Sequence, residues 1–267
     1  LESNNTNAEG TRDGFAGFDS NGFDVDSDGG GGGINYPSGR TYVAWNWKAG
    51  GTASSNSDGT ETVSLSANPT AGFSIIAYTG TGTTDGSDTV GHGLSQAPEL
   101  YFVKARTEAS HDWNAYAEPI GVANYVALNL TNASAAQSNG LNHDEAPTSS
   151  VITLGSWNAV NESSKNFIIY AFHSVEGYSK VGKYTGNGNA NGTFIYTGFR
   201  PAWLLIKKYD GTEDWIILDN KRDSYNVVRN GLYADLNNAE GASDKMDFLS
   251  NGFKMRSTTG VVNSSAN

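Results

Sequence analysis

The chain has 267 residues and a formal net charge of −11, with 37% hydrophobic residues, 17% charged residues and 33 glycines. It contains no Cys, which excludes disulfide bonds and thiol chemistry. The negative charge argues against nucleic acid as a partner, because phosphates would be repelled. No apolar run approaches the roughly 18 residues that a membrane-spanning helix needs, so we expect no membrane insertion.

Short stretches rich in Val, Ile, Tyr, Phe and Trp alternate with Gly, Asn, Ser and Thr along most of the sequence. This composition is typical of many short strands joined by turns. We therefore predict an all-β fold, built as tandem antiparallel β-sandwich (jelly-roll or lectin-like) repeats of about 100 residues.

Residues 1–50 are predicted to be the C-terminal half of one such repeat. They contain the acidic run Asp24-Val25-Asp26-Ser27-Asp28-Gly29. Asp24, Asp26 and Asp28 are candidate Ca²⁺ ligands, because alternating carboxylates before Gly can wrap a hard cation. Position 12 of the loop is Asn35 instead of the bidentate Glu, and this favours an acidic hairpin loop over a metal site.

Residues 51–70 form a Gly/Ser/Thr-rich stretch that we interpret as a linker. Residues 71–175 are predicted to be a complete β-sandwich repeat, and residues 176–267 a repeat that lacks its last strand. The evidence is a set of landmarks that recur in the same order. Tyr78-Thr79-Gly80-x-Gly82 matches Tyr184-Thr185-Gly186-x-Gly188, and each is followed by an apolar strand that ends in Lys and then by Asp-Trp.

In the last repeat we expect strands at residues 181–185, 193–197, 202–208, 215–219, 246–249 and 252–256. The missing last strand corresponds to residues 167–172 and 42–47 elsewhere. Val43, Trp45 and Trp47 share one face, as do Ile168, Tyr170 and Phe172, and we expect this face to form the sandwich core. One interpretation is that the N-terminal strand completes the last repeat in its own chain or in a neighbour. The sequence favours a simpler interpretation, in which the chain is cut from a longer array.

No catalytic fingerprint is present, and the four histidines lack metal-ligand spacing, so we predict that the protein is not an enzyme and carries no cofactor other than a possible Ca²⁺ ion. Trp157 is a candidate glycan contact, because it lies among polar residues. Trp113 and Trp215 occupy the same place in both copies and are predicted to be core residues.

Several ordered stretches carry a family resemblance, notably A-G-F-S-I-I-A-Y-T-G-T-G, G-H-G-L-S-Q-A-P, Y-T-G-F-R-P-A-W-L-L-I-K, D-F-L-S-N-G-F-K-M-R and T-Y-V-A-W-N-W-K-A-G-G. The chain resembles a repeat domain of tail, fibre and other virion-associated proteins of marine bacteriophages, including cyanophages. The resemblance implies a structural or adhesive protein on a virion surface or tail, outside the cell. Its partners would be other copies of itself, other virion proteins or host-surface polysaccharide.

Two alternatives stay open from the sequence. One is a secreted carbohydrate-binding module that uses Trp157 or a Ca²⁺ ion. The other is a subunit of an extracellular filament assembled by exchange of strands.

Overall fold

The computed structural model describes residues 1–11, 14–26, 34–35 and 39–265. Strands make up 34% of the chain and helices 4%, which confirms the all-β prediction. The chain divides into two compact units, which are described separately. One comprises residue 1 and residues 9–47, and the other comprises residues 2–8 and 48–267.

The smaller unit contains an antiparallel hairpin of β1 (Phe15–Phe18) and β2 (Phe23–Val25). The ring of Phe15 lies 4.9 Å from that of Phe18 and 6.1 Å from that of Phe23. Residues 40–47 have no regular secondary structure, whereas the sequence predicts a strand at 42–47. An extended segment becomes a strand only by hydrogen bonding to a neighbour, and the β1–β2 sheet does not include this segment.

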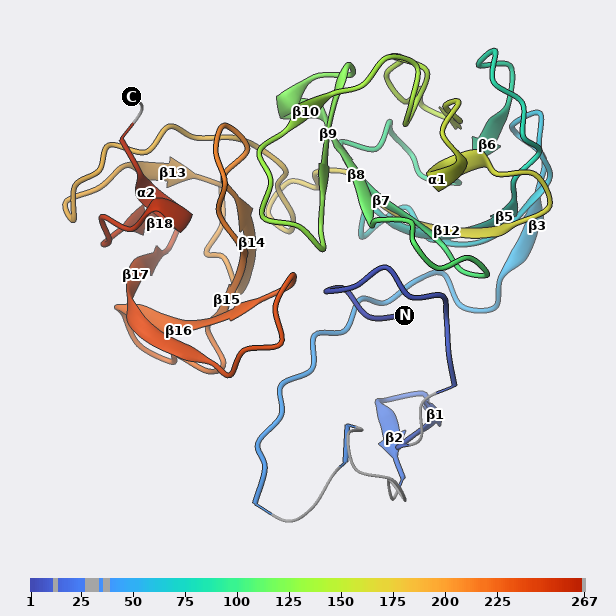
Figure 1. Cartoon of the computed structure of the whole chain (residues 1–267). Helices are drawn as coiled ribbons and strands as arrows, with labels where there is room; N and C mark the ends of the chain where they lie inside the picture. The colour runs from blue at the N-terminus through green and yellow to red at the C-terminus, as the bar shows by residue number, and fades with distance from the viewer. Residues whose placement is uncertain (12–13, 27–33, 36–38, 266–267) are drawn as a thin grey trace. The chain divides into compact units, whose positions relative to one another are not determined.

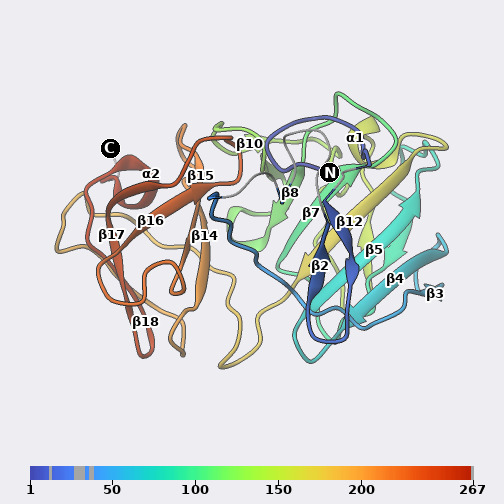
Figure 2. The same ribbon diagram turned by 90° about the horizontal axis from the view of Figure 1, so that it is seen from below.

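The larger unit begins with an eight-stranded antiparallel sheet in the order β10-β9-β8-β7-β12-β5-β4-β3. Figure 2 shows its central part, with β12 between β5 and β7. Its strands are β3 (Ser54–Asn56), β4 (Val63–Asn68), β5 (Phe73–Thr79), β7 (Leu100–Ala105), β8 (Asn114–Ala117), β9 (Asn124–Ala127), β10 (Ala135–Ala136) and β12 (Asn166–Phe172). A single 3-10 turn, Glu118–Ile120, follows β8. Two of these strands, β3 and β4, lie in the stretch that the sequence suggests is a linker.

One face of the eight-stranded sheet is covered by a second layer, formed by the pair β6 (Thr89–Gly91) and β11 (Val151–Thr153) and by the short helix α1 (Asn158–Asn161). Val90, Ile152 and Val160 from this layer join Ile76 and Phe167 from the sheet in one buried cluster. The layers are visible in Figure 1.

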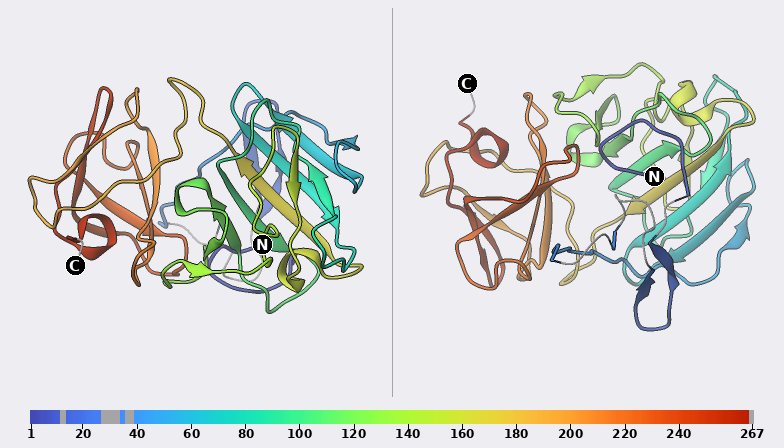
Figure 3. Two further views of the ribbon diagram at one scale, coloured as in Figure 1. Left: turned by 90° about the horizontal axis from the view of Figure 1, so that it is seen from above. Right: turned by 60° about the horizontal axis from the view of Figure 1, so that its bottom comes forward.

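A six-stranded antiparallel sheet follows in the order β13-β18-β17-β16-β15-β14. Its strands are β13 (Phe194–Tyr196), β14 (Trp203–Lys207), β15 (Trp215–Asp219), β16 (Val228–Tyr233), β17 (Gly241–Leu249) and β18 (Gly252–Met255). All six contribute to one core together with Val261 and Val262 of helix α2 (Gly260–Asn263). The sheet is therefore curled around that core, as the two views of Figure 3 show.

The larger unit has two parts, a first part that carries the eight-stranded sheet and a second part that carries the six-stranded sheet. The same local structure recurs in both. The Tyr78 hydroxyl donates to the Val160 carbonyl (2.6 Å), and the Tyr184 hydroxyl donates to the Val262 carbonyl (2.7 Å). The N–H of Thr81 donates to Asn161 Oδ1, and that of Asn187 to Asn263 Oδ1, both at 2.9 Å. The glycines that end the two sequence motifs, Gly82 and Gly188, both have positive φ, 83° and 63°, which favours Gly over other residues.

The strands correspond as well. The antiparallel series β7-β8-β9 is matched by β14-β15-β16, and the pair β6–β11 by β13–β18. The N–H of Trp113 donates to Asn129 Oδ1 (2.9 Å) and that of Trp215 to Asp235 Oδ1 (3.1 Å). One difference remains: β7 also pairs with β12, whereas β14 ends its sheet among the described residues.

This difference explains why the strand predicted at residues 181–185 is absent from the structure. Residues 181–185 correspond to the end of β5, which is held between β12 and β4. The second part has no described strand in the place of β12, so residues 181–185 have no ladder to join.

A third hydrophobic cluster joins the two sheets. Phe102, Trp113 and Val126 of the first sheet pack with Trp215, and the indole N–H of Trp215 donates to the Ala127 carbonyl at 2.8 Å. Trp113 is 6% exposed and Trp215 5%, so both are core residues, as predicted. The same cluster covers the second face of β12, where the sequence expected the main core. The fully buried face is the opposite one, which carries Phe167.

Candidate functional site

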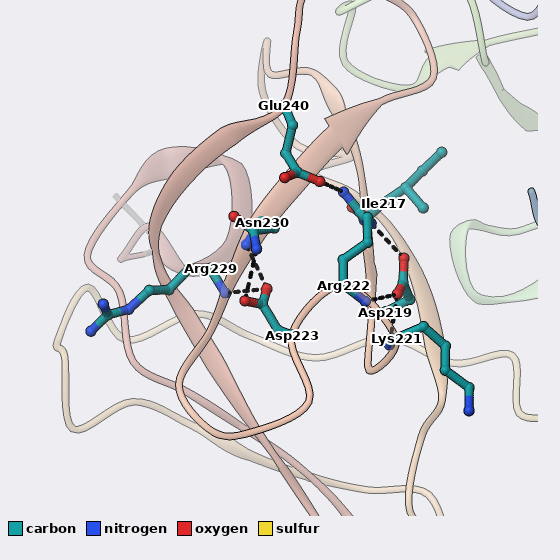
Figure 4. A network of polar contacts seen from close by, with 8 residues as sticks. All are labelled: Ile217, Asp219, Lys221, Arg222, Asp223, Arg229, Asn230 and Glu240. Atoms are coloured by element: carbon teal, nitrogen blue, oxygen red, sulfur yellow. Dashed lines mark hydrogen bonds and ion pairs between the residues drawn. The ribbon is translucent and has the colours of Figure 1, made fainter. Parts of the chain in front are cut away.

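The loop between β15 and β16 bounds an open concavity of about 420 Å³ on the six-stranded part. It is lined by Arg222, Asp223, Ser224, Tyr225, Asn226, Val227 and Arg229. Figure 4 shows the polar contacts of Asp219, Arg222 and Asp223 in this loop.

The loop starts on a buried carboxylate at the end of β15. Asp219 Oδ1 accepts the N–H groups of Lys221 and Arg222, both at 2.9 Å, and Oδ2 accepts the Arg222 Nε–H at 2.7 Å. Burial by itself would raise the pKa of Asp219. The Arg222 N–H and guanidinium and the Lys221 N–H outweigh burial and keep the pKa of Asp219 below its ordinary value. The carboxylate is therefore a charged anchor at neutral pH.

Arg222 continues this network across the sheet. Its guanidinium also donates to Glu240 (2.6 Å) and to the Ile217 carbonyl (3.2 Å), and its side chain is only 12% exposed. Arg222 thus serves to fix the loop rather than to offer a charge to a ligand (Figure 4).

Two further side chains fix the far end of the loop. Asp223 accepts the N–H groups of Arg229 (2.8 Å) and Asn230 (2.6 Å) and the side-chain amide of Asn230 (2.9 Å). The Asn226 amide pairs with the backbone of Phe248 in β17, donating to its carbonyl (3.1 Å) and accepting its N–H (2.9 Å). The side-chain amide of Asn226 thus pairs with Phe248 as the backbone of a neighbouring strand would.

Between these anchors the loop presents an aromatic ring to solvent. Tyr225 is 86% exposed, the highest value among the exposed large hydrophobic side chains of the described chain. The Arg229 side chain nearby is 57% exposed and forms an ion pair with Asp244 (2.6 Å). A phenol ring held on a fixed loop loses little conformational entropy on binding, and it offers an apolar face together with a hydroxyl. Such a surface can stack on a sugar ring and form hydrogen bonds with its hydroxyls.

Trp157, the glycan contact suggested by the sequence, lies in the first part of the larger unit, just before α1. Its ring is half-buried and packs against the first core, edge-on to Tyr125 with the ring centroids 4.8 Å apart. It also fits closely over Gly140, where an added Cβ would come within 2.0 Å of the indole. The indole has a packing role, and its role toward a glycan stays a prediction.

Of the three candidate Ca²⁺ ligands, Asp24 lies in β2 and Asp26 directly follows it, and both are exposed. The Asp26 carbonyl accepts a hydrogen bond from the Asn35 amide at 2.9 Å. Asp28 lies outside the described residues. Within the described part of the chain no group of three or more His, Cys, Asp or Glu is arranged to hold a metal ion. The Ca²⁺ loop therefore stays a prediction.

The sequence analysis did not single out the 219–230 loop, although Asp219, Asp223 and Asn226 are residues that favour turns. The run D-N-K-R-D-S-Y-N holds one aromatic residue among seven polar ones, and this was the available signal. None of the helices in the described ranges has the length and apolar character needed to cross a membrane.

Comparison with known proteins gives one match. The searches of curated proteins and of solved structures found no match. One family model matches residues 1–267, and the chain therefore belongs to the family described as a domain of unknown function, DUF7483.

Proposed function

We propose that the chain is a non-enzymatic structural module, built from tandem antiparallel β-sandwich repeats, in a tail, fibre or capsid-surface protein of a bacteriophage virion. In this role it contributes to assembly or to attachment to the host surface, and its partners are copies of itself or other virion proteins.

The observation that carries the proposal is a set of matching contacts and strand pairings in the two parts of the larger unit. The Tyr78–Val160 and Tyr184–Val262 hydrogen bonds and the matched strand series support two copies of one repeat. The repeats are packed together through the cluster around Trp215. Arrays of repeats are typical of proteins that extend, space or present surfaces. The resemblance to phage virion repeats gives the array its proposed setting.

The first experiment tests association with particles. Virions purified on a density gradient from the producing culture should contain this chain at a constant ratio to the other virion proteins. Gold-labelled antibody to the chain should decorate a tail or capsid surface. A chain found only as free protein, absent from washed particles, would contradict the virion role.

A second candidate function is glycan recognition, and the observation that favours it is the exposed Tyr225 on a loop fixed by Asp219, Asp223 and Asn226. The purified chain should then bind surface polysaccharide of the host saturably, and Tyr225→Ser should abolish binding. Tyr178→Ser is the matched control, because that side chain is also exposed (61%) but lies outside the concavity.

The same assay decides between this loop and the sites suggested by the sequence. Loss of binding in Trp157→Phe would assign recognition to Trp157, and loss with a chelator would implicate Asp24, Asp26 and Asp28. Unchanged binding in Tyr225→Ser would rule out the loop.

A further inference from the structure

The first part of the larger unit holds an N-terminal segment with one tryptophan and one lysine. The Trp113 indole N–H donates to the Glu2 carbonyl at 2.9 Å, and the Lys104 ammonium donates to the Thr6 carbonyl at 3.1 Å. Lys104 is fully buried, and its ammonium also donates to the Ala105 carbonyl at 3.1 Å. We call this tryptophan–lysine pair a clamp, because its two donors bind one stretch of backbone.

The second part has the same clamp, and there it binds a segment of the first part. The Trp215 indole N–H donates to the Ala127 carbonyl and the Lys207 ammonium to the Thr131 carbonyl, both at 2.8 Å. In both parts the acceptor of the lysine lies four residues after the acceptor of the tryptophan. The N-terminal segment therefore occupies, on the first part, the place that residues 127–131 occupy on the second.

Three segments of the chain share the sequence that the clamps hold. Residues 3–8 read S-N-N-T-N-A, residues 128–133 read L-N-L-T-N-A and residues 234–239 read A-D-L-N-N-A. The two clamps hold the first and the second of these segments. The third follows β16 as the second follows β9.

The third segment begins with the same backbone structure as the second. The Leu128 N–H donates to the Trp113 carbonyl at 2.9 Å, and the Ala234 N–H donates to the Trp215 carbonyl at 3.0 Å. The last residues of β9 and β16 also pair with β8 and β15 in the same register. The Tyr233 carbonyl is therefore the counterpart of the carbonyl that a clamp tryptophan binds in the second segment.

The third segment is more exposed than the other two at the positions that a clamp covers. Thr6 and Thr131, whose carbonyls bind the clamp lysines, are half-buried, whereas Asn237 at the same position is exposed. Ala239 is exposed as well, and the corresponding alanines of the other two segments are half-buried. The exposure matches a segment without a clamp on it.

The three segments also meet at one place. Ser3, Leu128 and Ala234 occupy the same position in the three sequences. The Ser3 hydroxyl donates to the Ala234 carbonyl at 2.6 Å, and Leu128 and Ala234 both belong to the cluster that joins the two sheets. Head-to-tail contacts that converge in this way close into a ring. Among the described residues this ring has three segments and two clamps.

We infer that residues 233–239 are the docking surface for the clamp of a further repeat. That repeat places its indole N–H on the Tyr233 carbonyl and its lysine on the Asn237 carbonyl. The partner is a repeat with an apolar strand that ends in Lys and is followed by Asp-Trp. It is neither part of this unit, because both of their clamps already hold a segment. The inference rests on the proposed function and names the contact that joins one repeat to the next.

A graft in the full chain tests whether the third segment is a ligand of the clamp. Four substitutions give residues 3–8 the sequence of residues 234–239, namely Ser3→Ala, Asn4→Asp, Asn5→Leu and Thr6→Asn. The hydrogen-exchange protection of residues 3–8 should be the same in the grafted and the native chain, because the clamp binds backbone carbonyls. Lys104→Met should lower this protection at least about ten-fold in both chains, since a charged donor is lost.

Lys207→Met is the matched control, because it removes the lysine of the other clamp and should leave residues 3–8 unchanged. Trp113→Phe removes only the indole N–H and keeps the test decisive if Lys104→Met impairs folding. Exchange in β12 reports on the fold in every variant. A grafted segment that loses its protection while both clamp residues are intact would overturn the inference, and so would protection that neither clamp variant changes.

Photocrosslinking in particles tests whether the third segment is occupied. Since the native chain has no Cys, Asn237→Cys offers a single thiol for a benzophenone reagent. The crosslinked peptide should carry an apolar strand that ends in Lys and is followed by Asp-Trp. Tyr178→Cys, at another exposed position, is the control.

No crosslink above the control would overturn the inference, as would a crosslink to this chain or to a second copy of it. In either case the chain is still present in the particles, so the proposed function stands. Absence of the chain from particles would instead contradict the proposed function, and the graft then decides whether the third segment binds a clamp.

Discussion

At the scale of single residues, the Tyr78–Val160 and Tyr184–Val262 hydrogen bonds are matching contacts that support the proposed repeat relation. Tyr78 is buried and Tyr184 is partly buried, and burial raises the pKa of each phenol above its ordinary value, so each stays a hydrogen-bond donor at neutral pH. The acceptors are the carbonyls of Val160 and Val262, each in a short helix. The next residue in each helix, Asn161 or Asn263, accepts an N–H from the segment that follows the tyrosine.

Removal of either hydroxyl should destabilise the fold to a similar extent. We expect Tyr78→Phe and Tyr184→Phe each to lower the free energy of unfolding by about 1–2 kcal/mol, because a buried carbonyl loses its donor. Denaturant titration measures the effect. Tyr196→Phe is the control, since that side chain is 68% exposed and should show no change. A loss at only one of the two tyrosines would argue against equivalent roles.

His92 gives the fold a pH dependence. It is fully buried, its Nδ1 accepts the Leu94 N–H (3.1 Å), and its Nε2 lies 3.2 Å from the Thr148 carbonyl, so the ring is neutral with its proton on Nε2. Burial, with a smaller repulsion from His173, lowers the pKa of His92 below the ordinary 6.5.

The direction of the pH effect follows from this shift. The unfolded chain binds a proton that the folded chain resists, so the stabilisation is complete above about pH 6.5 and is lost as the pH falls below it. Unfolding free energies at pH 7.5 and 5.5 should therefore differ more in the native chain than in His92→Gln. Equal pH dependence in the two proteins would contradict this assignment.

At the scale of elements, the sequence predicted those strands that have both a strand-like apolar pattern and a neighbouring strand to pair with. The prediction for β15, residues 215–219, coincides with the structure, and those for β12 and β18 differ by one residue at one end. Residues 181–185 and 42–47 have the pattern but no partner strand in the described chain, and pairing is a long-range property that local sequence does not reveal.

The opposite error occurred at β16, which the sequence analysis missed. Its sequence, V-R-N-G-L-Y, contains Asn and Gly, which are depleted in strands. Gly231 leaves room for the Ile216 side chain, because an added Cβ would lie 3.0 Å from Ile216 Cδ1. The candidate loop was missed because its organisation depends on Asp219, Asp223 and Asn226 contacting residues up to 22 positions away.

The loop also makes a prediction at this scale. Asp223→Ala removes the acceptor for two N–H groups and one side-chain amide, so we expect stability to fall by about 1–3 kcal/mol. Hydrogen exchange should accelerate at the amides of residues 229 and 230. Lys221→Ala is the matched control, because its side chain is exposed and only its backbone N–H is used. Unchanged exchange in Asp223→Ala would show that the loop does not depend on this carboxylate.

At the scale of the whole molecule, the eight-stranded and six-stranded sheets share a core around Trp215. Its indole contacts Phe102 (6.1 Å between ring centroids) and donates to the Ala127 carbonyl of the other sheet. Two sheets joined in this way should be stiff at the junction, which suits the proposed structural role.

Trp215→Ala should therefore affect both sheets. Loss of the buried ring should cost about 3–5 kcal/mol and separate one cooperative transition into two in calorimetry. Tyr225→Ala, at an exposed position, should leave a single transition at the native temperature. A single transition in Trp215→Ala as well would mean that the sheets are coupled by other contacts.

Cryo-electron microscopy of intact particles from the producing culture, at a resolution that traces strands, tests the central claim most directly. The account predicts density for this chain on a virion tail or capsid surface. Particles that lack this density, with the chain recovered only as a separate soluble protein, would contradict it.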